Sequence, residues 1–160
     1  MSRICLLWAL PLMVFAHPAL EIQISDLSRA INLSPDASGL YLKRGLLHQR
    51  HGNRDLAKQD FEAARALVDS ADVQVALGNL YLAEGDPERA SVYFAEAIKL
   101  SSKSSAAWLG QAKTATALGA DELALQSYRT YFQVADNPQP GNTMFPVVTR
   151  QCLKRSVCWV

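Results

Sequence analysis

The sequence predicts an all-α protein, an α-solenoid of about three helix pairs with a single half-repeat helix at its N-terminal end. Three windows along the chain share one spacing of small and aromatic residues. Breaks at Gly52-Asn53, Gly85-Asp86-Pro87 and Gly119 divide each window into two helical patterns. No stretch alternates apolar and polar residues for long enough to form a β-strand. One helix pair cannot bury its apolar face alone, so stacked pairs are expected to share a core.

The composition is that of one folded domain rather than a disordered or fibrous chain. The 160 residues are 49% hydrophobic and 19% charged. Sixteen Lys and Arg residues against 15 Asp and Glu residues leave a formal net charge of +1, which excludes the strongly basic field of a nucleic-acid-binding protein. Three cysteines are too few for a disulfide-built small fold or a four-thiolate zinc site.

Residues 1–16 are predicted to form a secretory signal peptide. Arg3 precedes an apolar run at residues 4–16, which is shorter than the ~20 residues that span a bilayer core. Val14 and Ala16 supply the small residues that a cleavage site after Ala16 requires. We therefore expect export, to the periplasm of a bacterium. A buried N-terminal helix and an uncleaved membrane anchor are the alternatives.

The repeat array is predicted over residues 37–138, in windows 38–71, 71–104 and 105–138. Each window has a small residue in its first helix, namely Gly45, Gly78 or Ala112. Its second helix has an alanine, namely Ala57, Ala90 or Ala124, and four residues later an aromatic residue, namely Phe61, Phe94 or Tyr128. This pattern resembles the tetratricopeptide repeat. The resemblance implies antiparallel helix pairs, with the small residues allowing close approach and the aromatic filling the space before the next pair. Gln74 and Tyr131 depart from the pattern, because an aromatic residue and an alanine are usual there.

Residues 17–36 are expected to form the half-repeat helix. Ala30 and Pro35 fall where the resemblance places a small residue and a proline near the end of a preceding repeat. This helix would cover the apolar N-terminal end of the stack. An unrelated capping helix is the alternative, and it would have the same physical effect.

Residues 139–160 are predicted to form an irregular basic tail. The segment 137–141 is rich in proline and carries a glycine, which indicates a turn or linker. Arg150, Lys154 and Arg155 give the tail a positive charge without an acidic residue. Three hypotheses remain open: the tail folds back over the third window with Cys152 and Cys158 joined in a disulfide, it is a flexible peptide for a membrane or a partner, or residues 142–160 come from a shifted reading frame.

The resemblance also implies a binding surface, because the first helices of successive repeats line a concave groove in this family. Its lining here would be apolar and small with a few cations and amides, which suits a protein or peptide segment with an acidic or C-terminal carboxylate group. The residues predicted to form this partner-binding groove are Lys43, Leu46, Gln49, Arg50, Val75, Asn79, Leu82, Leu109, Lys113 and Thr116. Ala76 and Gly110 are expected in the same lining, and they replace polar residues of the carboxylate clamp known in the family, so that clamp is not carried over. The alternative is that these positions are ordinary solvated surface.

No catalytic group can be assembled from the sequence, and no cofactor is expected. Phosphate-binding, nucleophile-elbow and metalloprotease motifs are absent. His48 and His51 have the spacing of metal ligands on a helix, with Asp55 near, but a zinc site needs at least three protein ligands. His48 falls instead where a packing tyrosine is usual. Asp60 and Glu62 are interpreted as part of a solvated helix face.

Together these observations predict a non-enzymatic protein-protein interaction module, a scaffold or assembly factor of the cell envelope. It would bind a partner segment in the groove. The alternative is a membrane-tethered accessory protein that uses an uncleaved N-terminal anchor and places its basic tail on anionic lipid. Homo-oligomerisation through the poorly capped C-terminal end is a further hypothesis.

Overall fold

The computed structural model describes residues 18–135, and these form seven α-helices with no strand among them. The predicted signal peptide and the predicted tail, including Cys152 and Cys158, lie outside the described residues. The helices are α1 Pro18–Leu33, α2 Ser38–Arg50, α3 Arg54–Leu67, α4 Ala71–Ala83, α5 Pro87–Leu100, α6 Ser105–Ala117 and α7 Asp121–Val134.

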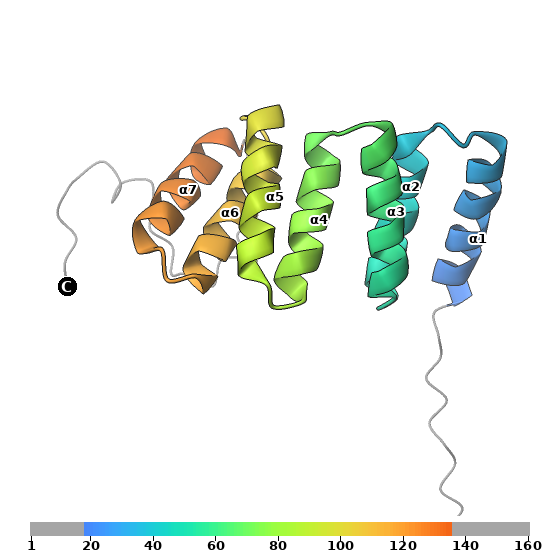
Figure 1. The fold of residues 1–160 in the computed structure, drawn as a ribbon, viewed down its shortest axis with the longest axis horizontal. Helices are drawn as coiled ribbons and strands as arrows, with labels where there is room; N and C mark the ends of the chain where they lie inside the picture. Colours follow the sequence, from blue (N-terminus) through green and yellow to red (C-terminus); the bar gives the residue numbers. More distant parts are fainter. Residues whose placement is uncertain (1–17, 136–160) are drawn as a thin grey trace, which may run out of the picture.

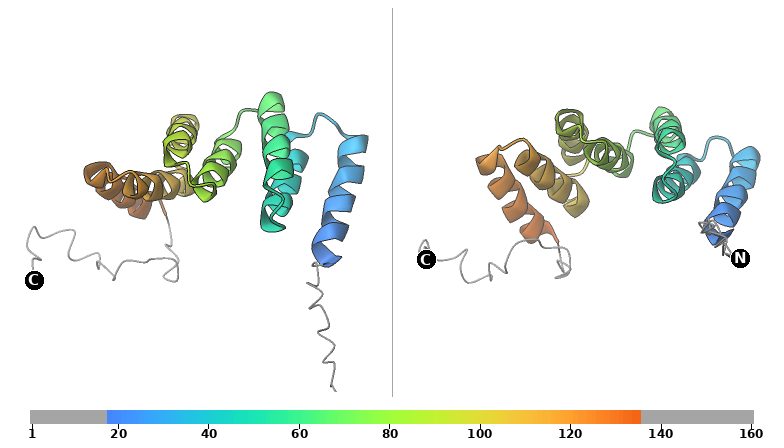
Figure 2. Two further views of the ribbon diagram at one scale, coloured as in Figure 1. Left: turned by 60° about the horizontal axis from the view of Figure 1, so that its bottom comes forward. Right: turned by 90° about the horizontal axis from the view of Figure 1, so that it is seen from below.

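Successive helices are antiparallel neighbours along one elongated array, and in the view of Figure 1 α2 lies partly behind α3. The strongest contacts join α2 with α3, α4 with α5 and α6 with α7, so these are the three predicted pairs. Helix α1 packs against α2 and forms the lone helix at the N-terminal end. Figure 2 shows the pairs from two further sides as successive units of one array. The predicted all-α solenoid of helix pairs with an N-terminal half-repeat is confirmed.

Each pair is closed by a turn that needs a glycine. Gly52, Gly85 and Gly119 have φ of 86°, 80° and 69°, a left-handed conformation that other residues adopt at a cost. After the second of these turns, the Asp86 side chain accepts a hydrogen bond from the backbone N–H of Arg89 at 2.9 Å and so caps α5. The helix boundaries therefore lie where the sequence places turn and capping residues.

The core is built around the aromatic residues of the second helices. Phe61 and Phe94 are fully buried. A Cβ added at Gly78 would lie 2.9 Å from the Phe94 ring, and one added at Gly110 would lie 2.0 Å from it. The Phe94 ring is therefore clamped between α4 of its own repeat and α6 of the next one, which is how one pair stacks on another.

The two junctions between repeats differ in closeness. Helix α5 packs more extensively against α6 than α3 does against α4. The residue that meets the aromatic ring of the preceding repeat is Gly110 at the closer junction, and Ala76 occupies the equivalent position at the other. The missing methyl group at Gly110 accounts for the closer approach of α6, because atoms in a packed core keep van der Waals distance.

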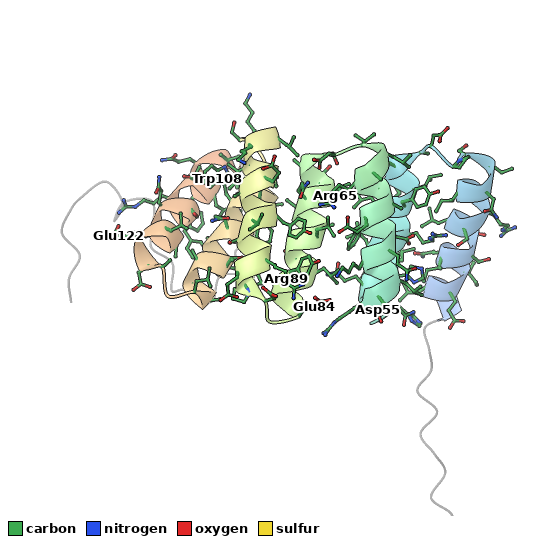
Figure 3. The ribbon with its side chains drawn as sticks, viewed as in Figure 1. Asp55, Arg65, Glu84, Arg89, Trp108 and Glu122 are labelled. Carbon is green, nitrogen blue, oxygen red and sulfur yellow. The ribbon has the colours of Figure 1, made fainter. Side chains whose placement is uncertain are left out.

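Polar groups replace the usual aromatic packing at one place in the array. Gln74, where an aromatic residue was expected from the resemblance, is buried, and its Nε2 donates to Asp69 Oδ1 at 2.5 Å. Trp108, at the equivalent position of the third repeat, donates from Nε1 to the carbonyl oxygen of Ser102 at 2.9 Å (Figure 3). Both side chains thus hold the start of their helix to the loop before it.

Candidate functional site: the face of the first helices

The predicted groove residues all lie on the first helices, which are neighbours in the array. Helix α2 contacts α4, and α4 contacts α6. We call the surface that these three helices present the first-helix face, made of the ten predicted residues. Six of them are exposed, namely Lys43, Leu46, Arg50, Asn79, Lys113 and Thr116, and four are half-buried, namely Gln49, Val75, Leu82 and Leu109.

Burial on this face repeats from helix to helix. Leu46, Asn79 and Lys113 occupy equivalent positions of the three helices, and all three are exposed. Val75 and Leu109, four residues before Asn79 and Lys113, are half-buried in both helices. An apolar base with exposed residues above it therefore runs across α4 and α6, as helical periodicity requires.

Two small residues expected in the lining are not on the surface. Ala76 is 4% exposed and belongs to the apolar cluster around Phe61. Gly110 is buried against the Phe94 ring. Both residues serve stacking between repeats, because the aromatic ring of the preceding second helix occupies the space beside them.

The structure shows a pocket at the N-terminal end of the face, between α1 and α2. Its volume is about 630 Å³. The wall from α2 consists of Leu47 and four predicted residues, namely Lys43, Leu46, Gln49 and Arg50. The wall from α1 consists of three residues that the sequence analysis did not single out, namely Gln23, Asp26 and Leu27. The predicted residues of α4 and α6 do not line it. The pocket thus brings four of the ten together with the half-repeat helix.

The α1 residues were missed because α1 was interpreted only as an end cap. Gln23, Asp26 and Leu27 are spaced three and four residues apart, so they share one side of α1. That spacing is the signal which could have indicated a second wall. It does not by itself show which helix the wall faces.

The three predicted cations of the first-helix face are free of ion pairs with the acids of the described residues. Within residues 18–135, Lys43, Arg50 and Lys113 make no ion pair. Asp26, the acid in the pocket wall, pairs instead with Arg29 on its own helix. The pocket and the face therefore keep a positive character.

Three cations on the second helices are paired. Arg65 binds Glu62 at 2.7 Å on α3, and Lys99 binds Glu96 at 2.7 Å on α5. Arg89 pairs with Asp86 at 2.5 Å at the start of α5, and Figure 3 labels Arg65 and Arg89 on these helices. Within residues 18–135 Arg54, Lys58 and Arg129 on the second helices make no ion pair, so unpaired cations are not confined to the first-helix face.

A partly buried ion pair joins α2 to α3, and its arginine also reaches α1. Asp60 on α3 is 4% exposed and accepts two hydrogen bonds from the Arg44 guanidinium, at 2.9 Å from Nε and 2.6 Å from Nη2. Arg44 also donates to Ser28 Oγ on α1 at 3.1 Å. The hydrogen bond to Asp60 raises the pKa of Arg44, so this guanidinium stays charged. The interpretation of Asp60 as solvated surface was wrong, because its partner comes from another helix.

His48 lies beside this pair. Its Nε2 is 3.9 Å from Asp60 Oδ2, and its side chain is 11% exposed. Burial lowers the pKa of His48 more than the Asp60 carboxylate raises it, so the ring is neutral at pH 7. Among the described residues its Nδ1 has no hydrogen-bonding partner. His48 therefore has the packing position that the sequence predicted for it, next to a charge.

No group of three or more His, Cys, Asp or Glu side chains in residues 18–135 is placed to hold a metal ion. No helix in the same part of the chain is both long and apolar enough to cross a membrane.

The comparisons agree with the repeat pattern. The family model of the tetratricopeptide repeat matches residues 71–114. No curated protein matches the sequence. The predicted resemblance to the tetratricopeptide repeat is confirmed by the family match together with the fold.

Solved structures with this fold include MamA and YrrB. A crystal structure of MamA superposes with a TM-score of 0.65 at 17% identity, over 73% of this chain and 69% of that chain. The structure titled "YrrB: a TPR protein with an unusual peptide-binding site" superposes with a TM-score of 0.61 at 22% identity, over 73% of this chain and 61% of that chain. At these identities the likeness shows the fold.

Proposed function

We propose that this chain, whose residues 71–114 match the tetratricopeptide repeat and whose fold agrees with that match, is a non-enzymatic interaction module that binds an acidic segment of a partner protein on its first-helix face. The repeats and the fold support a protein-protein interaction module. One observation carries the acidic partner: Lys43, Arg50 and Lys113 lie on this face and make no ion pair within residues 18–135. Complementary charge steers association and favours the matching partner over others.

The pocket between α1 and α2 would anchor the segment. Leu27, Leu46 and Leu47 give it apolar walls, and Lys43 and Arg50 contribute its cations. A volume of about 630 Å³ falls within the range of ligand pockets, roughly 300–1,000 Å³. An apolar side chain of the partner would fill it, with an acidic side chain or a C-terminal carboxylate beside it. Burying one large apolar side chain contributes about 2 kcal/mol.

Beyond the pocket the segment would continue across α4 and α6. Asn79 is exposed between the half-buried Val75 and Leu82, and its amide can both donate to and accept from a peptide backbone. Lys113 on α6 would meet a second acidic group. A peptide partner is also supported by the likeness to YrrB, whose title names a peptide-binding site.

We place this activity in the bacterial envelope, where the protein would act as a scaffold or assembly factor. The proposal of export to the periplasm rests on the apolar run and the cleavage pattern of residues 1–16. Interaction modules gain their role from the partners that they bring together, so identification of the partner would name the process.

The test is selection of peptides from a random display library with the whole protein as bait. The selected peptides are then titrated against the wild type and against the variant with Lys43→Glu and Arg50→Glu. A matched control carries Lys103→Glu and Arg129→Glu, which change the charge equally at exposed positions outside the first-helix face. We expect selected peptides to pair an apolar residue with Asp, Glu or a free carboxylate.

We expect the reversal at Lys43 and Arg50 to weaken binding at least tenfold, and the control to change it less than threefold. Binding should also weaken as salt is raised, because the charges involved are exposed. Equal binding by both variants, or selection of peptides without acidic groups, would contradict the proposal.

A further inference from the structure

The buried side of the third repeat differs from that of the second repeat. The buried apolar residues of α6 and α7 are all alanines, namely Ala107, Ala112, Ala115 and Ala124. Those of α4 and α5 include larger side chains, namely Leu77, Leu80, Tyr81 and Phe94. Neither apolar cluster of buried residues in the described part of the chain includes a residue of α6 or α7. The third repeat therefore gains little from apolar burial, although α6 approaches α5 closely.

Three buried polar side chains of the third repeat carry atoms that have no hydrogen-bonding partner among residues 18–135. These atoms are Gln111 Oε1, Thr114 Oγ1 and Ser127 Oγ. Thr114 and Ser127 are fully buried, and Gln111 is 8% exposed. A polar atom that leaves water without gaining a new partner destabilises the folded state. The folded third repeat thus combines a weak apolar gain with a polar penalty.

These polar side chains lie at the junction with the second repeat. Their equivalents in the second repeat are Leu77, Leu80 and Tyr93. The two leucines belong to the cluster around Phe61 of the first repeat, and the tyrosine packs against that cluster. The same positions of the third repeat therefore face the second repeat, as the close approach of Gly110 to the Phe94 ring also indicates. An apolar junction between the first two repeats is thus followed by a polar junction.

We propose that α6 and α7 unfold together as one unit, which separates from the array at the α5–α6 junction while α2 to α5 stay folded. Repeats stabilise one another through the interfaces that they share, so an array opens at its weakest interface. Helix α6 contacts α7 more extensively than it contacts α5, so the two helices leave as a pair. They have 13 and 14 residues, and isolated helices of about this length are marginal in water.

Opening at this junction would divide the first-helix face. Helix α6 carries Leu109, Lys113 and Thr116, and the other predicted residues of the face lie on α2 and α4. A partner segment that contacts Lys113 would bind only the closed array and would shift the population toward it. This consequence rests on the proposed function. The opening itself is a property of the free protein, so either proposal can fail while the other stands.

The opening is tested by hydrogen exchange of the free full chain, followed by mass spectrometry of peptides from each helix. We expect the amides of α6 and α7 to exchange at least tenfold faster than those of α3 and α4, and the two helices to exchange at matching rates. Equal protection of all four helices would overturn the proposal. Fast exchange in α7 with α6 as protected as α4 would also overturn it, because only the last helix would then be fraying.

A variant with Gln111→Leu and Thr114→Val tests the role of the polar junction, because it replaces two unpartnered polar groups with apolar groups of similar shape. The matched control carries Gln126→Leu and Thr130→Val, the same changes on α7. Gln126 is exposed, and the Thr130 hydroxyl already donates to the carbonyl oxygen of Gln126 at 3.0 Å. We expect exchange in α6 and α7 to slow at least fivefold in the first variant and to stay within twofold of wild type in the control.

Ser127→Ala removes the third unpartnered atom, from α7 rather than α6. It should slow exchange at least twofold in both helices, because they open as one unit. Slower exchange in α7 alone would contradict the paired opening. Unchanged exchange in both junction variants, or equal slowing by the first variant and its control, would overturn the role given to the polar junction.

Discussion

Substitution of Gly110 by alanine tests whether stacking depends on a glycine at the junction of the second and third repeats. The added Cβ would lie 2.0 Å from Phe94 Cε1 and 2.4 Å from both Cδ1 and Cζ. Carbon atoms in contact are usually separated by about 3.5–4.0 Å. The ring cannot move away freely, because the backbone at Gly78 confines its other side, where an added Cβ would be 2.9 Å away.

The expected cost follows from these distances. Overpacking of a core costs typically about 1–3 kcal/mol, and a contact this short belongs at the upper end. Alanine favours the helix over glycine by about 1 kcal/mol, which offsets part of it. We therefore expect Gly110→Ala to lower the free energy of unfolding by about 2 kcal/mol, or the melting temperature by roughly 8 °C.

Gly39→Ala is the matched control, because Gly39 also lies in a first helix but has no atom within 4 Å of an added Cβ. It should raise stability by up to about 1 kcal/mol. Urea unfolding followed by circular dichroism measures both variants. Adding Phe94→Leu to Gly110→Ala should recover part of the loss, since the shorter side chain makes room. If both glycine variants have the same midpoint, the proposed role of Gly110 is refuted.

Three further predictions concern buried polar residues. Asp60→Ala should lower the free energy of unfolding by about 2–3 kcal/mol in urea, because it leaves the Arg44 guanidinium partly buried and unpaired. The double change Arg44→Met with Asp60→Leu should lower it less, and equal losses in the two variants would contradict this reasoning. Burial lowers the pKa of His48 below 6.5, so the unfolded chain binds the proton more readily than the folded chain. The free energy of unfolding should therefore be at its full value above about pH 6.5 and fall as the pH drops through the lowered pKa of His48. His48→Gln should reduce the fall in melting temperature between pH 7 and pH 5, and an unchanged pH profile would exclude His48 as its cause. Gln111 is buried where the second repeat has Leu77, and its Oε1 has no hydrogen-bonding partner within residues 18–135. Gln111→Leu should therefore raise stability by roughly 1 kcal/mol in thermal unfolding, and a loss of stability would show that this oxygen has a partner.

The fold was predictable because its signals are local and repeated. The spacing from Gly78 to Ala90 and Phe94 recurs in each window, and the helix breaks carry glycine. The first helices begin at Ser38, Ala71 and Ser105, the first residues of the three windows. Such periodic patterns determine helix pairs without knowledge of distant contacts.

The site was less predictable because it depends on contacts between helices. Asp60 looks like a solvated acid in the sequence, since its partner Arg44 lies 16 residues away on another helix. Gly110 looks like a surface position until the Phe94 ring is placed against it. The first-helix positions follow from helical periodicity. The pocket does not, because it depends on how α1 crosses α2.

The most direct test of the central claim, that the first-helix face is the interaction surface, is site-specific photocrosslinking in the native cells. A photoreactive amino acid is placed at Leu46, Asn79 or Lys113 on this face, and at Val92 on α5 as the control, since Val92 is 67% exposed on a second helix. We predict that one partner is captured from the three first-helix positions and not from Val92. Capture of the partner from Val92 but from none of the three would contradict the account.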